Sequence, residues 1–205
     1  MDDKSGQRAG YHHGSLPSAL VAAALDLLDE RGLDKVSVRE VARRAGVSPG
    51  APFRHFSDRQ ALLTAVTDRI LADFEEWQSA ALASAQGPAM HAYGLGFVRY
   101  AIRHPHRFEL IKSRVFGAEQ PDELRGRLSR LEQTLGDIVV AGQRAGELPD
   151  GDPIMIAIAG QALVYGLSQM IIDGYLPRSE GEGLAEQVLN AFGPSVTGCG
   201  RGGDA

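Results

Sequence analysis

The stretch that decides the fold is residues 36–63, which read VSVREVARRAGVSPGAPFRHFSDRQALL. Ser37, Ser48 and Ser57 each stand just before a short segment whose apolar residues lie three or four apart. A serine in that position can accept a hydrogen bond from the free backbone N–H groups of a first helical turn. Gly46 is placed to end the first helix in a left-handed conformation. The stretch therefore predicts three helices separated by short turns.

Two further signals support these helix starts. Glu40 and Gln60 each follow one of the serines by three residues, which is the spacing of a capping box. Pro49 follows Ser48 at a first helical position, where no backbone N–H is needed. A helix, a three-residue turn and a second short helix form the helix-turn-helix plan, in which the second helix enters the major groove of DNA.

The short middle helix is predicted to have two faces. Phe53 and Phe56 are three residues apart and are expected to pin it to the core. Pro52 lacks a backbone donor and is tolerated only in or near the first turn. Small residues on the other face would allow close approach to DNA, and an arginine fork there matches O6 and N7 of guanine. That face carries Gly50, Ala51, Arg54 and His55.

Over residues 11–73 the chain resembles the TetR family of bacterial transcriptional regulators. The resemblance rests on the helix of residues 16–31 and on the segment SVREVARRAGVSPGAPFRHFSDRQALL. It implies that the helix beginning near Ser37 supports a DNA-reading helix at residues 49–56. It also implies an all-α protein with a helix-turn-helix head and a helical body that binds an effector and dimerises.

The resemblance and the local pattern together give a set of candidate DNA-binding residues. Arg54 is the candidate for a base edge, while His55 either donates to a phosphate or only packs. The resemblance assigns a backbone contact to Arg59. Many relatives have a phosphate-binding tyrosine where Phe53 stands, so only a core role is expected for this phenylalanine. The set is Ser37, Arg39, Ser48, Pro49, Gly50, Ala51, Arg54, His55 and Arg59.

The charge distribution agrees with a local DNA-binding surface. The 205 residues include 21 basic and 26 acidic residues, a net charge of −5. Between residues 36 and 60 there are five arginines, at 39, 43, 44, 54 and 59, and two carboxylates, a local charge of +3 that leaves −8 for the rest. Arg43 and Arg44 are explained as well by a solvated face. This pattern favours specific binding over general nucleic-acid affinity.

The rest of the chain reads as helical, with about nine helices and no convincing strand alternation. The expected divisions are a flexible arm (1–10), a DNA-binding domain (11–58), an effector-binding and dimerisation domain (59–193) and a flexible tail (194–205). The single cysteine, Cys199, allows no intramolecular disulfide. No apolar signal segment begins the sequence, so a cytoplasmic location is expected.

Residues 154–172 are hydrophobic almost all round and raise the alternative of a membrane span. Polar residues interrupt the segment, and its neighbours are acidic rather than basic. A buried helix packed against another subunit is the favoured interpretation. The family resemblance assigns Pro153–Asp173 and Gly183–Phe192 to a homodimer interface.

The body contains an aromatic stripe at helical spacing, which is explained either by plain core packing or by a pocket for a small effector. The candidate pocket residues are Trp77, Tyr93, Phe97, Tyr100, Phe108, Phe116 and Tyr165. Arg103, Glu109 and Lys112 would give such a pocket polarity or would face water.

Neither a metal site nor a catalytic site is expected. The two histidine pairs lack accompanying carboxylate or thiolate ligands, and no nucleophile, P-loop or cofactor motif is present. The leading hypothesis is a ligand-responsive repressor that binds a palindromic DNA operator as a homodimer and needs no cofactor. The alternative is a helical small-molecule-binding or membrane-associated protein with a vestigial helix-turn-helix.

Overall fold

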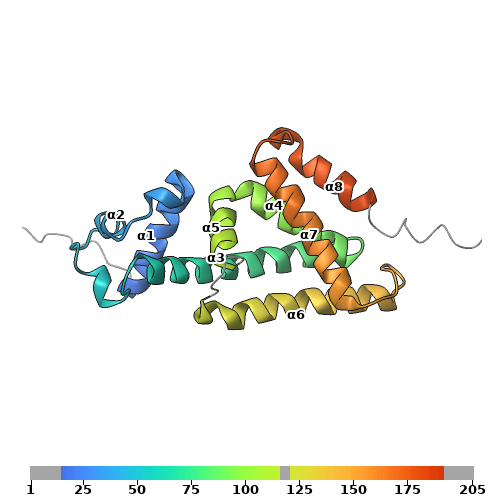
Figure 1. Cartoon of the computed structure of the whole chain (residues 1–205), viewed down its shortest axis with the longest axis horizontal. Coiled ribbons are helices and arrows are strands. Elements are labelled where there is room, and N and C mark those ends of the chain that lie inside the picture. Colours follow the sequence, from blue (N-terminus) through green and yellow to red (C-terminus); the bar gives the residue numbers. More distant parts are fainter. Residues whose placement is uncertain (1–14, 116–120, 192–205) are drawn as a thin grey trace, which may run out of the picture. The chain divides into compact units, whose positions relative to one another are not determined.

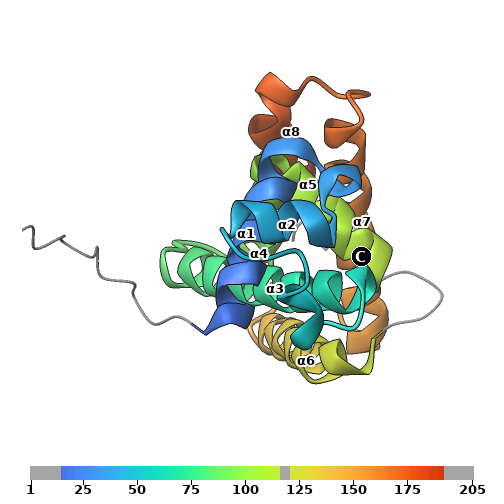
Figure 2. The same cartoon turned by 90° about the vertical axis from the view of Figure 1, so that its left-hand side faces the viewer.

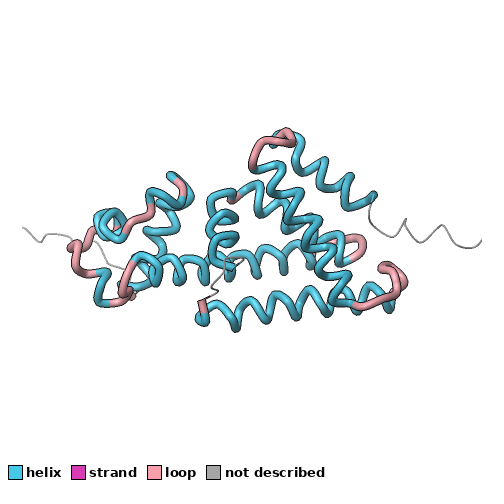
Figure 3. Tube along the Cα trace, in the orientation of Figure 1, coloured by secondary structure: helices cyan, strands magenta, loops and turns pink. Residues whose placement is uncertain are grey.

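The computed structural model describes residues 15–115 and 121–191. This described part is all-helical, as the sequence predicts, and contains no strand (Figures 1 and 3). The α-helices are α1 (Leu16–Arg31), α2 (Val38–Arg44), α3 (Arg59–Ala83), α4 (Ala89–Arg103), α5 (Pro105–Val115), α6 (Asp122–Arg144), α7 (Pro153–Ile172) and α8 (Gly181–Ala191). Three short 3-10 turns are η1 (Leu33–Lys35), η2 (Pro52–Arg54) and η3 (Arg178–Glu180).

The helix boundaries follow the sequence signals closely. The first helix spans the predicted residues, and the breaks at 87–88 and 104–105 fall where expected. The described residues contain eight α-helices instead of about nine, because the predicted middle helix of the head is the 3-10 turn η2. The predicted arm at 1–10 and tail at 194–205 lie outside the described residues.

The chain divides into two compact units, Met1–Leu62 and Leu63–Ala205, here called the head and the body. In the head, α1 and α2 pack together (Figure 2). Leu20, Leu27, Val41 and Leu62 are fully buried there. Burying each of these side chains stabilises the fold by roughly 1.5–3 kcal/mol, so the head has a core of its own.

In the body, α7 packs on α4, α6 and α8 (Figure 1). One core cluster joins Leu95 and Val98 of α4 to Val164, Leu167 and Ile171 of α7. Within the same unit, the Arg127 guanidinium of α6 donates to Asp68 at 2.7 Å and to Glu75 at 2.6 Å, both on α3. The body therefore combines apolar packing with a charged clamp between two of its long helices.

Close approach of α3 and α4 depends on a glycine. The Trp77 indole N–H donates to the Gly96 carbonyl oxygen over 2.9 Å. A Cβ atom at position 96 would collide with Gln78 Oε1 and lie 3.1 Å from the Ala81 Cβ. The two helices can therefore pack this tightly only because residue 96 has no side chain.

Helix α7 keeps an exposed apolar face. Among the described residues it is the one helix whose length and composition would also suit a membrane span, and only 22% of the relevant window is buried. Large apolar side chains at its start are more than half exposed, for example Ile154 at 64% and Met155 at 56%. Ile158, Met170 and the following Tyr175 are exposed as well. This face lacks a cover within the chain.

Candidate DNA-binding surface and ligand cavity

The first helix of the motif, α2, is fixed at both ends by the predicted caps. The Ser37 hydroxyl accepts a hydrogen bond from the Glu40 backbone N–H at 3.2 Å. The predicted return bond of the capping box is replaced, because both Glu40 carboxylate oxygens accept from Arg43. At the other end Gly46 has a φ of 70°, and the Val47 N–H donates to the Ala42 carbonyl at 3.0 Å. These bonds form a Schellman motif that turns the chain sharply.

The predicted α-helix from Ser48 is wrong in detail. The segment is a turn followed by η2, with hydrogen bonds from the Ala51 N–H to the Ser48 carbonyl (3.0 Å) and from the Arg54 N–H to the Ala51 carbonyl (3.3 Å). These are three-residue spacings, as in a 3-10 helix. Pro52 has no N–H to donate to Ser48, so the first regular α-helical bond cannot form.

The expected core role of Phe53 is also wrong. Its side chain is 57% exposed, whereas Pro52 and Phe56 are buried. The prediction assumed a continuous helix in which residues 53 and 56 share a face. The backbone instead leaves helical geometry at His55 (φ −122°, ψ −32°), so the two phenylalanines point to different environments.

The next helix starts one residue later than its predicted cap. The Asp58 carboxylate, rather than the Ser57 hydroxyl, accepts from the Ala61 N–H at 2.8 Å. The Ser57 hydroxyl donates to the same carboxylate at 3.2 Å. A carboxylate is well suited to this place, because it also interacts favourably with the positive end of the helix dipole.

The structure gives Arg59 a different task from the expected DNA-backbone contact. Its guanidinium is partly buried and donates to the Val36 carbonyl at 2.6 Å and to the Leu33 carbonyl at 2.8 Å. Both carbonyls belong to the connection between α1 and α2. Arg59 therefore positions the motif by joining the start of α3 to that connection.

The remaining candidates differ in whether their charges are already paired. Arg43 is paired with Glu40, and the Arg44 guanidinium pairs with Glu30. Hydrogen bonding to these arginines is the main reason why the pKa values of Glu30 and Glu40 lie below their usual range. Arg39 and Arg54 are exposed, and no residue in the described ranges forms a hydrogen bond or ion pair with either side chain. The unpaired positive charge of the motif is thus carried by Arg39 and Arg54.

The small and polar candidates lie on the same segment. Ala51 is partly buried, and a Cβ atom at Gly50 would contact nothing within 4 Å. The side chains that remain accessible in and around η2 are Ser48, Pro49, Gly50, Phe53, Arg54 and His55. Phe53 is the member that the sequence did not supply, because its exposure follows from the 3-10 geometry.

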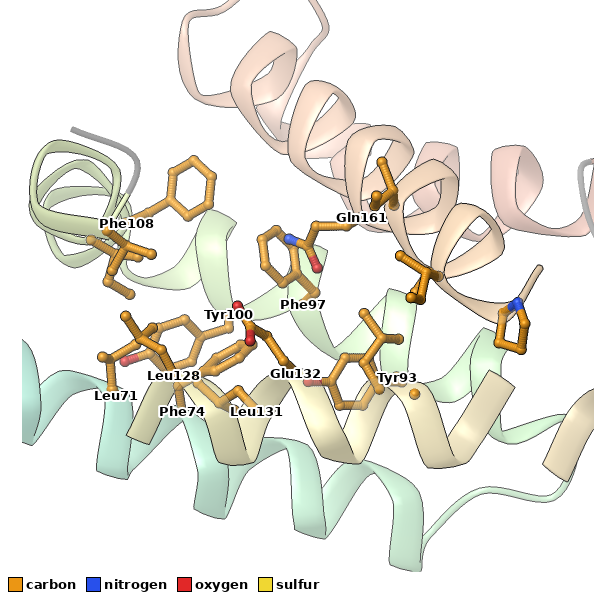
Figure 4. Close-up of a pocket in the computed structure, with 18 of the residues that line it drawn as sticks. Leu71, Phe74, Tyr93, Phe97, Tyr100, Phe108, Leu128, Leu131, Glu132 and Gln161 are labelled. Atoms are coloured by element: carbon orange, nitrogen blue, oxygen red, sulfur yellow. The ribbon is translucent and has the colours of Figure 1, made fainter. Parts of the chain in front are cut away.

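The body encloses a cavity of about 660 Å³ (Figure 4). Four of the predicted pocket aromatics line it, and edge-to-face contacts join Phe97 to Phe108 and to Phe74. Burial raises the pKa of the Tyr93 phenol. The aromatic lining is Phe74, Tyr93, Phe97, Tyr100 and Phe108.

The other predicted pocket residues lie behind the wall or outside the described part. The Trp77 ring packs against Tyr100, with 5.7 Å between ring centroids, and does not line the cavity. Tyr165 packs against the lining residue Phe108 at 5.5 Å. Phe116 is outside the described residues. Arg103, Glu109 and Lys112, the candidates for polarity, are not lining residues either.

Much of the lining was missed by the aromatic pattern. It comes from the aliphatic faces of α5, α6 and α7, where spacing alone cannot separate cavity wall from core. Its polar members are Glu132 of α6 and Gln161 of α7. The aliphatic members include Leu71, Ile111, Val115, Leu128, Leu131, Leu135, Val140, Ile154, Ala157 and Ile158. Across residues 15–115 and 121–191, no group of three or more histidine, cysteine or acidic side chains could hold a metal ion.

Known proteins share both units of this chain. Residues 20–66 match the family model described as bacterial regulatory proteins of the tetR family, and residues 90–192 match the tetracyclin repressor-like C-terminal domain. The class A tetracycline repressor protein from transposon 1721 of Escherichia coli is 42% identical over 57 residues, covering 28% of this chain and 26% of that protein. The chain therefore matches only about a quarter of that relative's length.

Two other relatives extend over most of the chain. The HTH-type transcriptional regulator BetI of Rhizobium meliloti is 29% identical over 179 residues, covering 84% of this chain and 87% of that protein. A solved structure of a protein of unknown function from Rhodococcus sp. RHA1 has a TM-score of 0.76 and 29% identity, covering 89% and 97% of the two chains. With one family model on the head and another on half of the chain in the body, the protein belongs to the TetR family of bacterial regulatory proteins.

Proposed function

We propose that this protein is a sequence-specific transcriptional regulator, a ligand-responsive repressor that binds a palindromic DNA operator as a homodimer. The observation that carries this proposal is the pairing of a capped helix-turn-helix, with Arg39 and Arg54 unpaired on it, with a large apolar cavity in the body. Family membership and the relatives named as repressors and transcriptional regulators support it. The protein carries out no catalytic step in this role, and it acts in the cytoplasm.

The reading surface is formed by the accessible residues around η2. Arg54 is proposed to donate to a guanine edge and His55 to a phosphate, while the Gly50 backbone approaches the DNA closely. Phe53 adds an apolar surface suited to a thymine methyl group. Ser37, Arg39 and Ser48 are proposed to contact phosphates beside it, whereas Arg59 acts only by positioning the motif.

Dimerisation is proposed to cover the exposed face of α7. Large apolar side chains exposed along one helix are costly in water, and a second copy of the chain supplies a matching surface. The assigned segments, Pro153–Asp173 and Gly183–Phe192, include this face and the adjacent α8. A Met155→Glu variant should be monomeric at concentrations where the parent is dimeric in analytical ultracentrifugation.

The proposed switch uses the cavity. Helix α3 begins in the head at Arg59 and lines the cavity with Leu71 and Phe74. A ligand that favours one arrangement of the cavity wall shifts the population of α3 positions, and so the spacing of the two reading heads. Because a dimer must match half-sites about one helical turn of DNA apart or a multiple of it, a small change in spacing disfavours the operator complex.

The deciding experiment is selection of bound sequences from a random DNA pool. We expect a palindrome with two half-sites, and saturable retardation of that DNA in a gel shift. Arg54→Ala should lose about 1–3 kcal/mol of discrimination at one base position. Arg144→Ala, an exposed arginine of the body, removes the same charge and should retain the parent's specificity. Failure to enrich any sequence would refute the proposal and favour a ligand-binding protein with a vestigial head.

A further inference from the structure

The polar groups of the cavity differ in charge from what an anionic ligand needs. Glu132 is the one charged side chain among the described lining residues, and these include no lysine, arginine or histidine. The Glu132 carboxylate points into the cavity, as does the Gln161 amide (Figure 4). The cavity therefore offers one full negative charge and a neutral hydrogen-bonding group, surrounded by apolar walls.

The Glu132 carboxylate has no partner in the described part of the chain. No hydrogen bond or ion pair joins it to residues 15–115 or 121–191. Other acidic residues of the body are paired, for example Asp68 and Glu75 with Arg127. A carboxylate beside apolar walls loses hydration without gaining a donor, so a ligand that brings its own positive charge has the most to gain there.

The walls suit the same kind of ligand. Aromatic side chains line the cavity on several sides, and an aromatic ring attracts a cation to its face. The aliphatic side chains of α6 and α7 complete a surface for an extended apolar body. A volume of about 660 Å³ falls in the range of sites for drug-sized molecules. An anion of the same size would be repelled by Glu132 and would find no cationic partner among the lining residues.

We propose that the effector of this protein is an amphipathic organic cation, whose charged nitrogen lies at Glu132 and whose apolar body fills the aromatic and aliphatic part of the cavity. The proposal deepens the regulatory function proposed above and rests on it for its biological meaning. Binding of the cation itself is a property of the cavity and is measured without DNA.

The test uses three probes with the same chain and different head charges: decyltrimethylammonium, decyldimethylamine oxide and decyl sulfate, each below its micelle concentration at pH 8. The full-length protein reports on binding through its single tryptophan, Trp77, which packs on the lining residue Tyr100 with 5.7 Å between ring centroids. Isothermal titration calorimetry gives an independent dissociation constant. We expect the cation to bind about 5–10-fold more tightly than the neutral probe, and the anion more weakly than both.

Two matched variants assign the preference to one carboxylate. Glu132→Gln keeps the shape and removes the charge, so the cation should fall to the affinity of the neutral probe. Glu123→Gln makes the same change on an exposed residue of α6 outside the cavity and should keep the parent's preference. Absence of binding by all three probes, equal or tighter binding of decyl sulfate by the parent, or an unchanged preference in Glu132→Gln would each overturn the proposal.

The probe series in the parent protein keeps the test valid if Glu132→Gln folds poorly. Operator binding by the parent is measured separately by gel shift. A parent that shows the cation preference but enriches no DNA sequence would refute the regulatory function and leave the ligand class standing. A parent that binds an operator but shows no cation preference would refute only the ligand class.

Discussion

The head and the body use unpaired charge in opposite ways. In the head, Glu40 and Glu30 neutralise two of the motif's arginines, while Arg39 and Arg54 remain exposed and unpaired among the described residues. In the body, Arg127 is held by two carboxylates, while Glu132 stays without a partner on the lining of an apolar cavity. In each unit the charge proposed to meet a ligand is the one that the fold leaves unsatisfied, positive for DNA and negative for a cation.

The difference between the units also concerns where the recognition surface lies. In the head it is the outside of a small core, and its shape depends on backbone hydrogen bonds at caps and turns. In the body it is an internal wall, and its shape depends on how tightly long helices pack. Substitutions that separate a holding residue from a recognising residue therefore give the sharpest tests, and the largest effects belong to the holding residues.

The two phenylalanines of the reading turn should differ most. Phe56 is 8% exposed, so Phe56→Ala should lower the free energy of unfolding by about 3–5 kcal/mol. Phe53 is 57% exposed, so Phe53→Ala should change it by less than about 0.5 kcal/mol and instead weaken operator binding at a thymine position. Urea unfolding followed by circular dichroism, with fluorescence anisotropy on operator DNA, measures both effects. Equal destabilisation by the two variants would return Phe53 to the core.

The arginine that braces the motif should come next. Arg59→Met removes two charge-assisted hydrogen bonds to the Val36 and Leu33 carbonyls and should cost about 2–4 kcal/mol of folding stability. Arg54→Met, on the exposed turn, should leave stability unchanged. The same urea titrations decide the matter. If Arg59→Met were as stable as the parent but weakened binding to all DNA sequences equally, Arg59 would be a phosphate contact after all.

These two tests also mark how far the sequence could predict the head. The helix bounds followed from Ser37, Gly46 and the apolar spacing, because such caps act through local hydrogen bonds. The exposure of Phe53 could not be read from spacing, because Pro52 removes a backbone donor and the resulting 3-10 turn changes which residues share a face. The task of Arg59 was equally hidden, since its carbonyl partners lie 23 and 26 residues earlier in the chain.

The body was less predictable for a related reason. Helical periodicity identified the aromatic stripe of α4, and three of its members, Tyr93, Phe97 and Tyr100, do line the cavity. Periodicity reports which face of a helix is apolar, but a cavity is a gap between several such faces. Trp77 and Glu132 were therefore misjudged in opposite directions, since Trp77 packs behind the wall and the polar lining residue was not foreseen.

Two glycines compare the units directly. Gly96→Ala forces a methyl group against Gln78 and Ala81 where α3 and α4 approach, and should destabilise the protein by about 1–3 kcal/mol. Gly50→Ala meets nothing within 4 Å in the head, so the free energy of unfolding should be unchanged. Operator affinity should nevertheless fall, because the added methyl group blocks close approach to DNA. A parent-like operator affinity in Gly50→Ala would mean that this backbone does not approach the DNA.

The smallest expected effect compares two arginines of the same helix. Arg39 and Arg43 are both exposed on α2, but Arg43 is already paired with Glu40 over 2.6 Å. If Arg39 binds a phosphate, Arg39→Ala should reduce the slope of log affinity against log salt by about 0.9, the value for one released counterion. Arg43→Ala should change the slope much less, since a charge held by a carboxylate displaces fewer counterions. Anisotropy titrations between low and moderate salt measure both slopes. Equal slopes in the two variants would show that internal pairing does not decide which arginines meet the DNA.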